Sequence, residues 1–228
     1  MNGWYRLVKS YTSRNLTVGT DKLPALSGLI STLEEKCNAQ CYAGLWLNRD
    51  LDDLCWQVDH ESRPATRPAQ WRAPSWSFAS LDGTVWYEMW MHENKYATLL
   101  DVAVLPASAD PHGELLSGHI ILKAPMFQLY DFEMIGPGKL EAFAKIIDPP
   151  MKATSFTVKI FLDVMEEPTC SALWLDRGGG LAVVPTGNAD GEYRRVGLVK
   201  AWYGRTENSV RPIDLDVERL DLTVCTLV

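Results

Sequence analysis

A change of hydrophobic period near residues 59–74 constrains this chain more than any other feature of its sequence. Before that segment, apolar residues recur every three or four positions, as in WYRLVKSY, which is typical of amphipathic helices. After it, short β-branched or aromatic runs such as SFTVKIFLDV alternate between two faces. The segment between them is rich in proline and cannot form a long helix. The sequence therefore predicts an α+β fold with a helical part over residues 1–58, an ordered Pro-rich connection over 59–74, and a β-rich part over 75–228.

The β-rich part is expected to form a larger antiparallel, curved sheet or a partly open β-barrel, with the helical part packed on it in one compact unit. Within the helical part, a stripe of leucine and isoleucine follows an N-cap at Thr20 or Asp21, and residues 39–56 form further short helices. The run WSFAS is expected to be a strand with Trp76 and Phe78 on one face. KLEAFAKI and PIDLDVER are expected to be helical interruptions.

Charge and cysteine content restrict the partners and the compartment. The formal net charge of −7 argues against binding to nucleic acid or to an anionic membrane surface. No apolar run approaches the roughly 18 residues that span a bilayer, and the first residues lack a secretory signal. The odd, scattered set of five cysteines fits a reducing compartment, so we expect a cytoplasmic location. Neither the cysteines nor the histidines have metal-ligand spacing, so no metal site is expected.

Candidate binding residues come from two short aromatic and basic segments. Arg72, Trp76 and Ser77 lie in one of them, and Tyr193 and Arg194 lie in the other. A structural interpretation places the aromatic rings in the core and lets Arg72 tie down a loop through its planar donor fork. A functional interpretation makes the same residues the wall of a pocket that binds an anion. The nine tryptophans are compatible with both, and they favour aromatic anchors of a β-rich core over an aromatic-lined pocket.

Three blocks of the chain resemble a known family in the right order. They are YTSRNLTVGTDKLPALSGL at residues 11–29, YAGLW at 42–46 and RAPSWSFASLDG at 72–83, with a weaker echo in YRRVGL at 193–198. Together they resemble the region that follows the defining domain of fungal heterokaryon-incompatibility (HET) proteins. In that family the defining domain, which is distantly similar to TIR domains, precedes these blocks. Only ten residues precede the first block here, so the resemblance implies no NAD-directed chemistry and no cofactor for this chain.

Two functions remain open at this point. The resemblance implies a non-catalytic regulatory or interaction module that contacts another protein or a small apolar molecule. The alternative is a small-molecule enzyme, such as a cyclase or isomerase of fungal secondary metabolism, that works in an aromatic-lined pocket. An enclosed apolar cavity with a convergent acid or base would favour the enzyme, whereas a filled β-rich interior with an exposed apolar patch would favour the interaction module.

Overall fold

The computed structural model describes residues 2–47, 51–59, 61, 64–87, 96–136, 140–147, 155–165, 170–201 and 221–228. Its helices are α1 (Asn2–Thr12) and α2 (Ser27–Cys37), with short 3-10 turns at Gly19–Lys22, Pro24–Leu26, Asp52–Leu54 and Phe78–Ser80. Its strands are β1 (Trp56–Val58), β2 (Val85–Tyr87), β3 (Thr98–Pro106), β4 (Leu115–Met134), β5 (Glu141–Ile147), β6 (Ser155–Leu162), β7 (Ser171–Asp176), β8 (Gly179–Pro185), β9 (Glu192–Ala201) and β10 (Leu222–Leu227).

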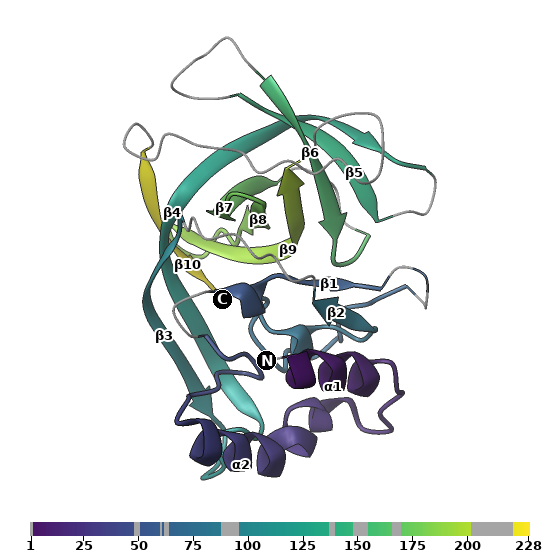
Figure 1. The fold of residues 1–228 in the computed structure, drawn as a ribbon, viewed down its shortest axis with the longest axis vertical. Coiled ribbons are helices and arrows are strands. Elements are labelled where there is room, and N and C mark those ends of the chain that lie inside the picture. The colour runs from purple at the N-terminus through teal and green to yellow at the C-terminus, as the bar shows by residue number, and fades with distance from the viewer. Residues whose placement is uncertain are drawn as a thin grey trace.

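The two helices form a layer at one end of the molecule, next to the small β1–β2 sheet (Figure 1). Helix α1 buries Trp4 and Val8, which share one face because they are four residues apart. The hydroxyl of its last residue, Thr12, donates a hydrogen bond to the Val8 carbonyl at 2.8 Å and accepts one from the backbone N–H of Val85 at 3.0 Å. Helix α2 ends where Asn38 adopts the left-handed conformation, a common way for a helix to stop.

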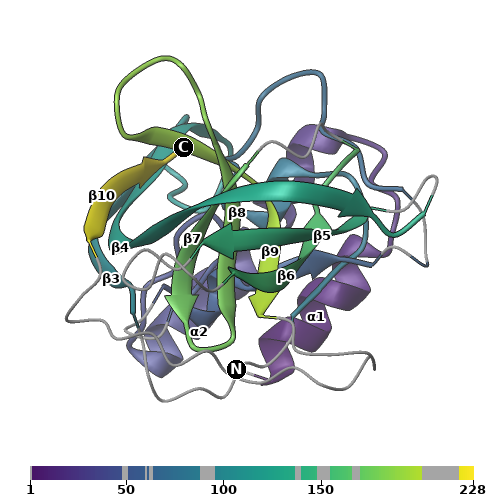
Figure 2. The same cartoon turned by 90° about the horizontal axis from the view of Figure 1, so that it is seen from above.

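The larger sheet has the strand order β10-β4-β5-β6-β9-β8-β7, with β3 paired to β4 at one side. Its pairings are antiparallel apart from a short parallel contact between β10 and β9. Additional pairings between β4 and β7 and between β10 and β9 bend the sheet strongly. Viewed from above, β4, β5 and β6 cross over the helical layer (Figure 2). The sheet is therefore curved and partly ringed, without forming a barrel.

Strand β4 spans 20 residues and arches from the helical layer to the far end of the molecule (Figure 1). Its first half pairs with β3 and β10, its middle with β7, and its last part with β5. Buried residues fill two hydrophobic clusters, one around the helices and the small sheet, and one inside the far end of the large sheet. Strand β4 contributes Ile120 and Leu122 to the first cluster and Phe127 and Leu129 to the second.

Several sequence-based expectations are confirmed. The fold is α+β and dominated by antiparallel sheet, and strands occupy the predicted runs from Thr98 onward wherever the structure describes them. In β6, Val158, Ile160 and Leu162 share the buried face, as the alternation predicts. The expected helix PIDLDVER, at residues 212–219, lies outside the described residues.

Other expectations are wrong. From Glu141 onward, KLEAFAKI is strand β5 and not a helix, because β4 and β6 pair with its two edges. WSFAS contains the 3-10 turn Phe78–Ser80, not a strand. In the described part of residues 39–56 there is one 3-10 turn and no α-helix, and β1 begins at Trp56. Helix α2 begins at Ser27, so Thr20 and Asp21 lie in a separate 3-10 turn that has no side-chain cap.

Candidate functional site

The first and third family-like blocks meet at the side chain of Arg72. Its Nε donates to the Ala79 carbonyl at 2.6 Å, and its Nη1 donates to the Gly19 carbonyl at 3.0 Å. Its Nη2 donates to the Leu81 carbonyl at 2.8 Å and to an Asp82 carboxylate oxygen at 2.7 Å. The planar fork of guanidinium donors suits this set of acceptors, which a lysine could not reproduce. Arg72 therefore ties the residue 79–82 turn to the loop at Gly19.

One further contact joins the first block to the third, and a second contact holds the first block's own residues together. The Lys22 ammonium is 3% exposed and donates to the Leu81 carbonyl, which Arg72 also contacts. The Tyr11 hydroxyl donates to the Lys22 carbonyl at 3.0 Å. Burying a cation is costly unless its N–H groups find hydrogen-bond acceptors. The contacts of Arg72 and Lys22 supply such acceptors, and we call this cluster of contacts the junction.

The second block joins the same junction through close backbone contacts. The Ser77 hydroxyl donates to the Ala43 carbonyl at 2.7 Å. Gly44 has φ of +84°, and a Cβ at this position would stand 2.7 Å from Cε1 of the Phe78 ring. Glycine is the residue that adopts this backbone conformation without strain and lets the ring approach. The three family-like blocks, which lie far apart in sequence, thus fold into one structural junction.

Trp76 and Ser77 are part of the interior. Trp76 and Ser77 are both 0% exposed, and the Trp76 carbonyl accepts a hydrogen bond from Trp56 Nε1 at 2.8 Å. The Ser77 hydroxyl also accepts from the Ala79 backbone at 3.1 Å, which caps the short 3-10 turn. Their contacts link the turn to β1 and to the residue 43–44 loop.

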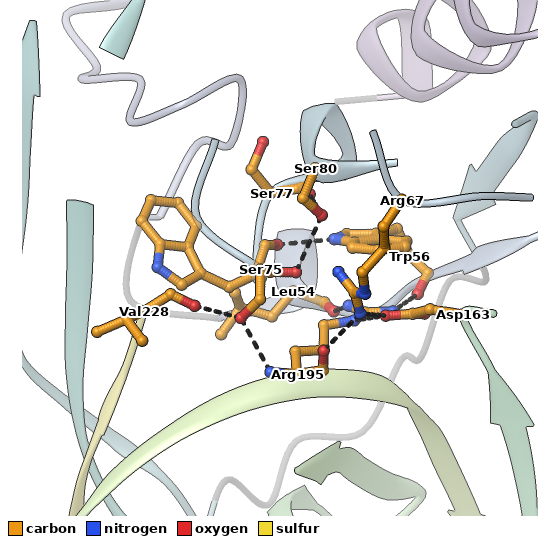
Figure 3. A network of polar contacts seen from close by, with 10 residues as sticks. Leu54, Trp56, Arg67, Ser75, Ser77, Ser80, Asp163, Arg195 and Val228 are labelled. Atoms are coloured by element: carbon orange, nitrogen blue, oxygen red, sulfur yellow. Dashed lines mark hydrogen bonds and ion pairs between the residues drawn. The ribbon is translucent and has the colours of Figure 1, made fainter. Parts of the chain in front are cut away.

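A buried ion pair between Arg195 and Asp163 joins β9 to the rest of the molecule (Figure 3). Arg195 is 0% exposed and forms a forked pair with Asp163, with Nε–Oδ2 at 3.1 Å and Nη2–Oδ1 at 3.2 Å. Its remaining donors reach the carbonyls of Leu54 at 2.6 Å and Trp56 at 2.5 Å. The guanidinium also stacks over the Trp56 ring, 3.3 Å from its centroid. All three guanidinium nitrogens of Arg195 and both carboxylate oxygens of Asp163 therefore have hydrogen-bond partners, which offsets part of the cost of burying the two charges.

The same network extends to the end of the chain through Ser75 (Figure 3). The Ser75 hydroxyl accepts a hydrogen bond from the Arg195 backbone at 2.9 Å and donates to the Val228 carbonyl. Arg67 donates to the Arg195 carbonyl at 2.9 Å and lies 3.9 Å from Asp163. The network therefore holds the residue 67–75 segment against β9 and β10.

The other two candidate residues lie on β9 beside this network. Tyr193 and Arg194 are half-buried; Tyr193 pairs with Pro185 and Leu227, and its carbonyl accepts from the Val228 backbone at 3.1 Å. Arg194 alternates with Arg195 along the strand, and it is Arg195 that points inward.

A second buried carboxyl group, Asp53, lies between α1 and the loop before β1. Asp53 is 1% exposed, and its two oxygens accept hydrogen bonds from the Tyr5 hydroxyl at 2.6 Å and the Trp46 backbone at 2.7 Å. Burial raises the pKa of Asp53 to about 6, although both hydrogen bonds act in the opposite direction. Burial and the Asp53 charge together raise the pKa of Tyr5 well above its usual range.

An apolar groove of about 490 Å³ lies between α1 and α2. Its volume falls in the range of small-molecule sites, about 300–1,000 Å³. Its walls are two tryptophans in edge-to-face contact, three aliphatic side chains, a glycine, an alanine and a thiol: Gly3, Trp4, Leu7, Leu29, Leu33, Cys37, Ala39 and Trp46. None of these groove residues carries a charged side chain. The groove is open to solvent, since Gly3, Leu29 and Cys37 are exposed.

None of the five candidate residues from the sequence lines this groove. Arg72, Trp76 and Ser77 belong to the junction, and Tyr193 and Arg194 belong to β9. In the sequence, the groove could be anticipated only from helical spacing: Trp4 and Leu7 are three residues apart in one segment, and Leu29 and Leu33 are four apart in another. This spacing shows that each helix has an apolar face. It does not show that the two faces lie side by side, because that is a tertiary contact.

No group of three or more potential metal ligands occurs among the residues that the structure describes. Within the same residues, no helix has the length and hydrophobicity needed to cross a bilayer. Comparison with known proteins found no matching family model, no matching curated protein and no matching solved structure. The resemblance to the HET family therefore stays a prediction from the sequence blocks.

Proposed function

We propose that this chain is a non-catalytic recognition module, related to the regulatory region of HET proteins, that binds another molecule through the α1–α2 groove. The observation that carries the proposal is the groove itself, an exposed apolar surface between two helices. Exposed apolar area of this kind gains free energy when a partner covers it, at about 25 cal/mol for each Å² removed from water.

The distribution of titratable groups supports recognition over catalysis. The carboxyl group with a raised pKa, Asp53, is buried, accepts hydrogen bonds from the Tyr5 hydroxyl and the Trp46 backbone, and does not line the groove. Burial lowers the pKa of the Lys200 amine to about 8, but this amine packs on the Phe161 ring at 4.5 Å and does not line the groove. General acid–base catalysis needs such groups within hydrogen-bond reach of one bound substrate. The groove instead brings together apolar side chains.

A neutral fluorescent probe, N-phenyl-1-naphthylamine, tests the proposal. A Cβ at Gly3, which lines the groove, or at Gly28, which does not, would have no neighbour within 4 Å. We expect Gly3→Leu to fill the groove mouth and abolish probe binding, and Gly28→Leu to leave binding unchanged. Both substitutions remove a helical glycine, so both variants should fold at least as stably as the parent protein. Equal probe binding by all three proteins would contradict the proposal.

A further inference from the structure

A second pocket, of about 370 Å³, lies where the small β1–β2 sheet meets β5 and β6 of the large sheet (Figure 1). One wall comes from Gln57 on β1 and Trp86 on β2, which are paired across the small sheet. Another wall comes from Glu141 on β5 and Phe161 on β6, which are also cross-strand partners. Helix α1 contributes Lys9. None of these residues lines the α1–α2 groove, so this pocket is a separate site.

Ion pairs position the charged side chains of this pocket. Lys9 Nζ lies 3.8 Å from a carboxylate oxygen of Asp59, which also lines the pocket. Glu141 lies 2.8 Å from Lys159 Nζ. The side chains of Lys9, Asp59 and Glu141 are 55%, 24% and 24% exposed, so a molecule in the pocket can reach their polar atoms. The pocket therefore offers hydrogen-bond acceptors and a donor at the same time.

The charges in and beside the pocket balance. The lining carries three carboxylates and one ammonium group: Asp59, Glu61, Glu141 and Lys9. Two further ammonium groups lie next to it, since Lys159 Nζ is 4.8 Å and Lys200 Nζ is 4.5 Å from the centroid of the Phe161 ring. Burial lowers the pKa of Lys200 to about 8, so its amine is still cationic at pH 6.5. A site with equal numbers of opposite charges selects neither an anion nor a cation, and it favours an uncharged polar ligand.

Trp86 adds an apolar ring to these polar groups. Its side chain is half-buried and lines the pocket, and Lys200 Nζ lies 5.9 Å from the ring centroid. A pyranose sugar has C–H groups on its two faces and hydroxyls around its rim. The C–H groups pack on the electron-rich face of an indole, while the hydroxyls exchange hydrogen bonds with carboxylates and ammonium groups at the edge. The lining of this pocket combines both kinds of contact.

We propose that this pocket binds an uncharged sugar, with a pyranose ring packed on Trp86 and its hydroxyls hydrogen-bonded to Asp59, Glu141 and Lys9. The two carboxylates accept hydrogen bonds from hydroxyls, and the ammonium group donates to a hydroxyl oxygen. The pocket volume of about 370 Å³ lies within the range of small-molecule sites. The inference goes beyond the proposed function, because it assigns a ligand class to a second site and does not depend on the groove.

The test measures binding of the methyl glycosides of glucose, galactose and mannose by saturation-transfer NMR at pH 6.5. We expect at least one of them to bind, and sorbitol to bind more weakly because an open chain has no rigid C–H face. The uronic-acid and amino-sugar counterparts of the bound sugar should bind no more tightly than the sugar itself. A charged counterpart that binds more tightly by about ten-fold would overturn the uncharged ligand class. If none of the three glycosides binds, the inference is wrong.

Variants of the lining locate the bound sugar. Trp86→Ala should weaken binding about ten-fold. Trp71→Ala should leave binding unchanged, since Trp71 is 52% exposed and does not line the pocket. Glu141→Gln keeps the shape of its side chain and should weaken binding about three-fold, because a hydrogen bond to a charged group is stronger than one to an amide. This variant tests the site even if Trp86→Ala fails to fold.

Two comparisons decide the outcome. Sugar binding that is as tight to Glu141→Gln and to any folded Trp86→Ala protein as to the parent would place the sugar elsewhere and overturn the inference. Gly3→Leu, which alters the α1–α2 groove, should leave sugar binding unchanged. Failure of the naphthylamine probe to bind would therefore count against the groove alone, and failure of the glycosides to bind would count against this pocket alone.

Discussion

Replacement of Asp53 by asparagine should change how the stability of the protein depends on pH. Asp53 has an ordinary pKa of 3.8, and burial raises it to about 6 in the folded protein. Below about pH 3 the carboxyl is protonated in both the folded and the unfolded chain. Between about pH 3 and pH 6 the unfolded chain releases this proton while the folded protein keeps it, so the contribution of Asp53 to stability falls as pH rises. Above pH 6 the contribution is constant.

The size of the effect follows from the shift. One pKa unit corresponds to about 1.4 kcal/mol, so Asp53 should lower the free energy of unfolding by about 3 kcal/mol between pH 3 and pH 7. Asparagine does not titrate, and it can still accept the Trp46 backbone hydrogen bond and meet the Tyr5 hydroxyl. The packing and hydrogen bonds of the asparagine itself do not depend on pH, so they change the stability of the variant by the same amount at every pH. The difference between the two proteins therefore isolates the titration of residue 53.

The assay is urea denaturation of the parent protein and D53N at pH 3, 4, 5, 6 and 7. The free energy of unfolding of D53N, minus that of the parent, should rise by about 3 kcal/mol from pH 3 to pH 7, with the change concentrated below pH 6. A difference that stays constant would show that the pKa of Asp53 is not raised by burial. A difference that falls with pH would mean that its hydrogen bonds outweigh burial and that the reasoning has the wrong sign.

Three further substitutions test the structural network, each by urea or thermal denaturation. Trp76→Ala should destabilise the fold by about 3–5 kcal/mol, while Trp76→Phe should cost less because no described group accepts the Trp76 indole N–H; an unchanged midpoint for Trp76→Ala would contradict its burial. Arg195→Met should cost about 3–5 kcal/mol because it leaves Asp163 buried without its forked partner, and R195M/D163L should recover part of that loss. A double variant no more stable than R195M would show that the loss comes from packing. Gly44→Ala should cost more than about 1 kcal/mol because of its positive φ and the Phe78 ring, and Phe78→Leu in the same chain should add less than it does alone.

Local sequence patterns predicted the elements whose burial repeats with a single period. The alternation in β6 and the helical stripe of α1 are read directly from spacing, because one face of each element is buried. Strand β5 was wrongly predicted to be a helix because its buried positions include Ala142 and Ala144, and alanine favours helices by intrinsic propensity. Pairing with β4 and β6 outweighs that propensity, and such pairing is not encoded within the segment itself.

The interior around Trp76 could not be predicted for a different reason. A strand has one buried face, but the 75–80 turn is surrounded by the residue 43–44 loop, β1 and β9, so Trp76 and Ser77 are both buried although they are neighbours. Alternation fails wherever a segment is covered on all sides. The two arginines on β9 were unpredictable for yet another reason. Which of Arg194 and Arg195 faces the interior depends on the register of the strand, and the sequence alone does not determine that register.

The length of β4 makes the molecule intolerant of errors in strand alignment. A slip of one residue along this strand would exchange its two faces, moving Ile120 and Leu122 out of one cluster and Phe127 and Leu129 out of the other. The same slip would break the registers with β3, β10, β7 and β5 together. Misaligned pairings are therefore penalised at both ends of the molecule at once. The helical end and the far end of the sheet should consequently lose their structure in a single cooperative transition, although each has a hydrophobic cluster of its own.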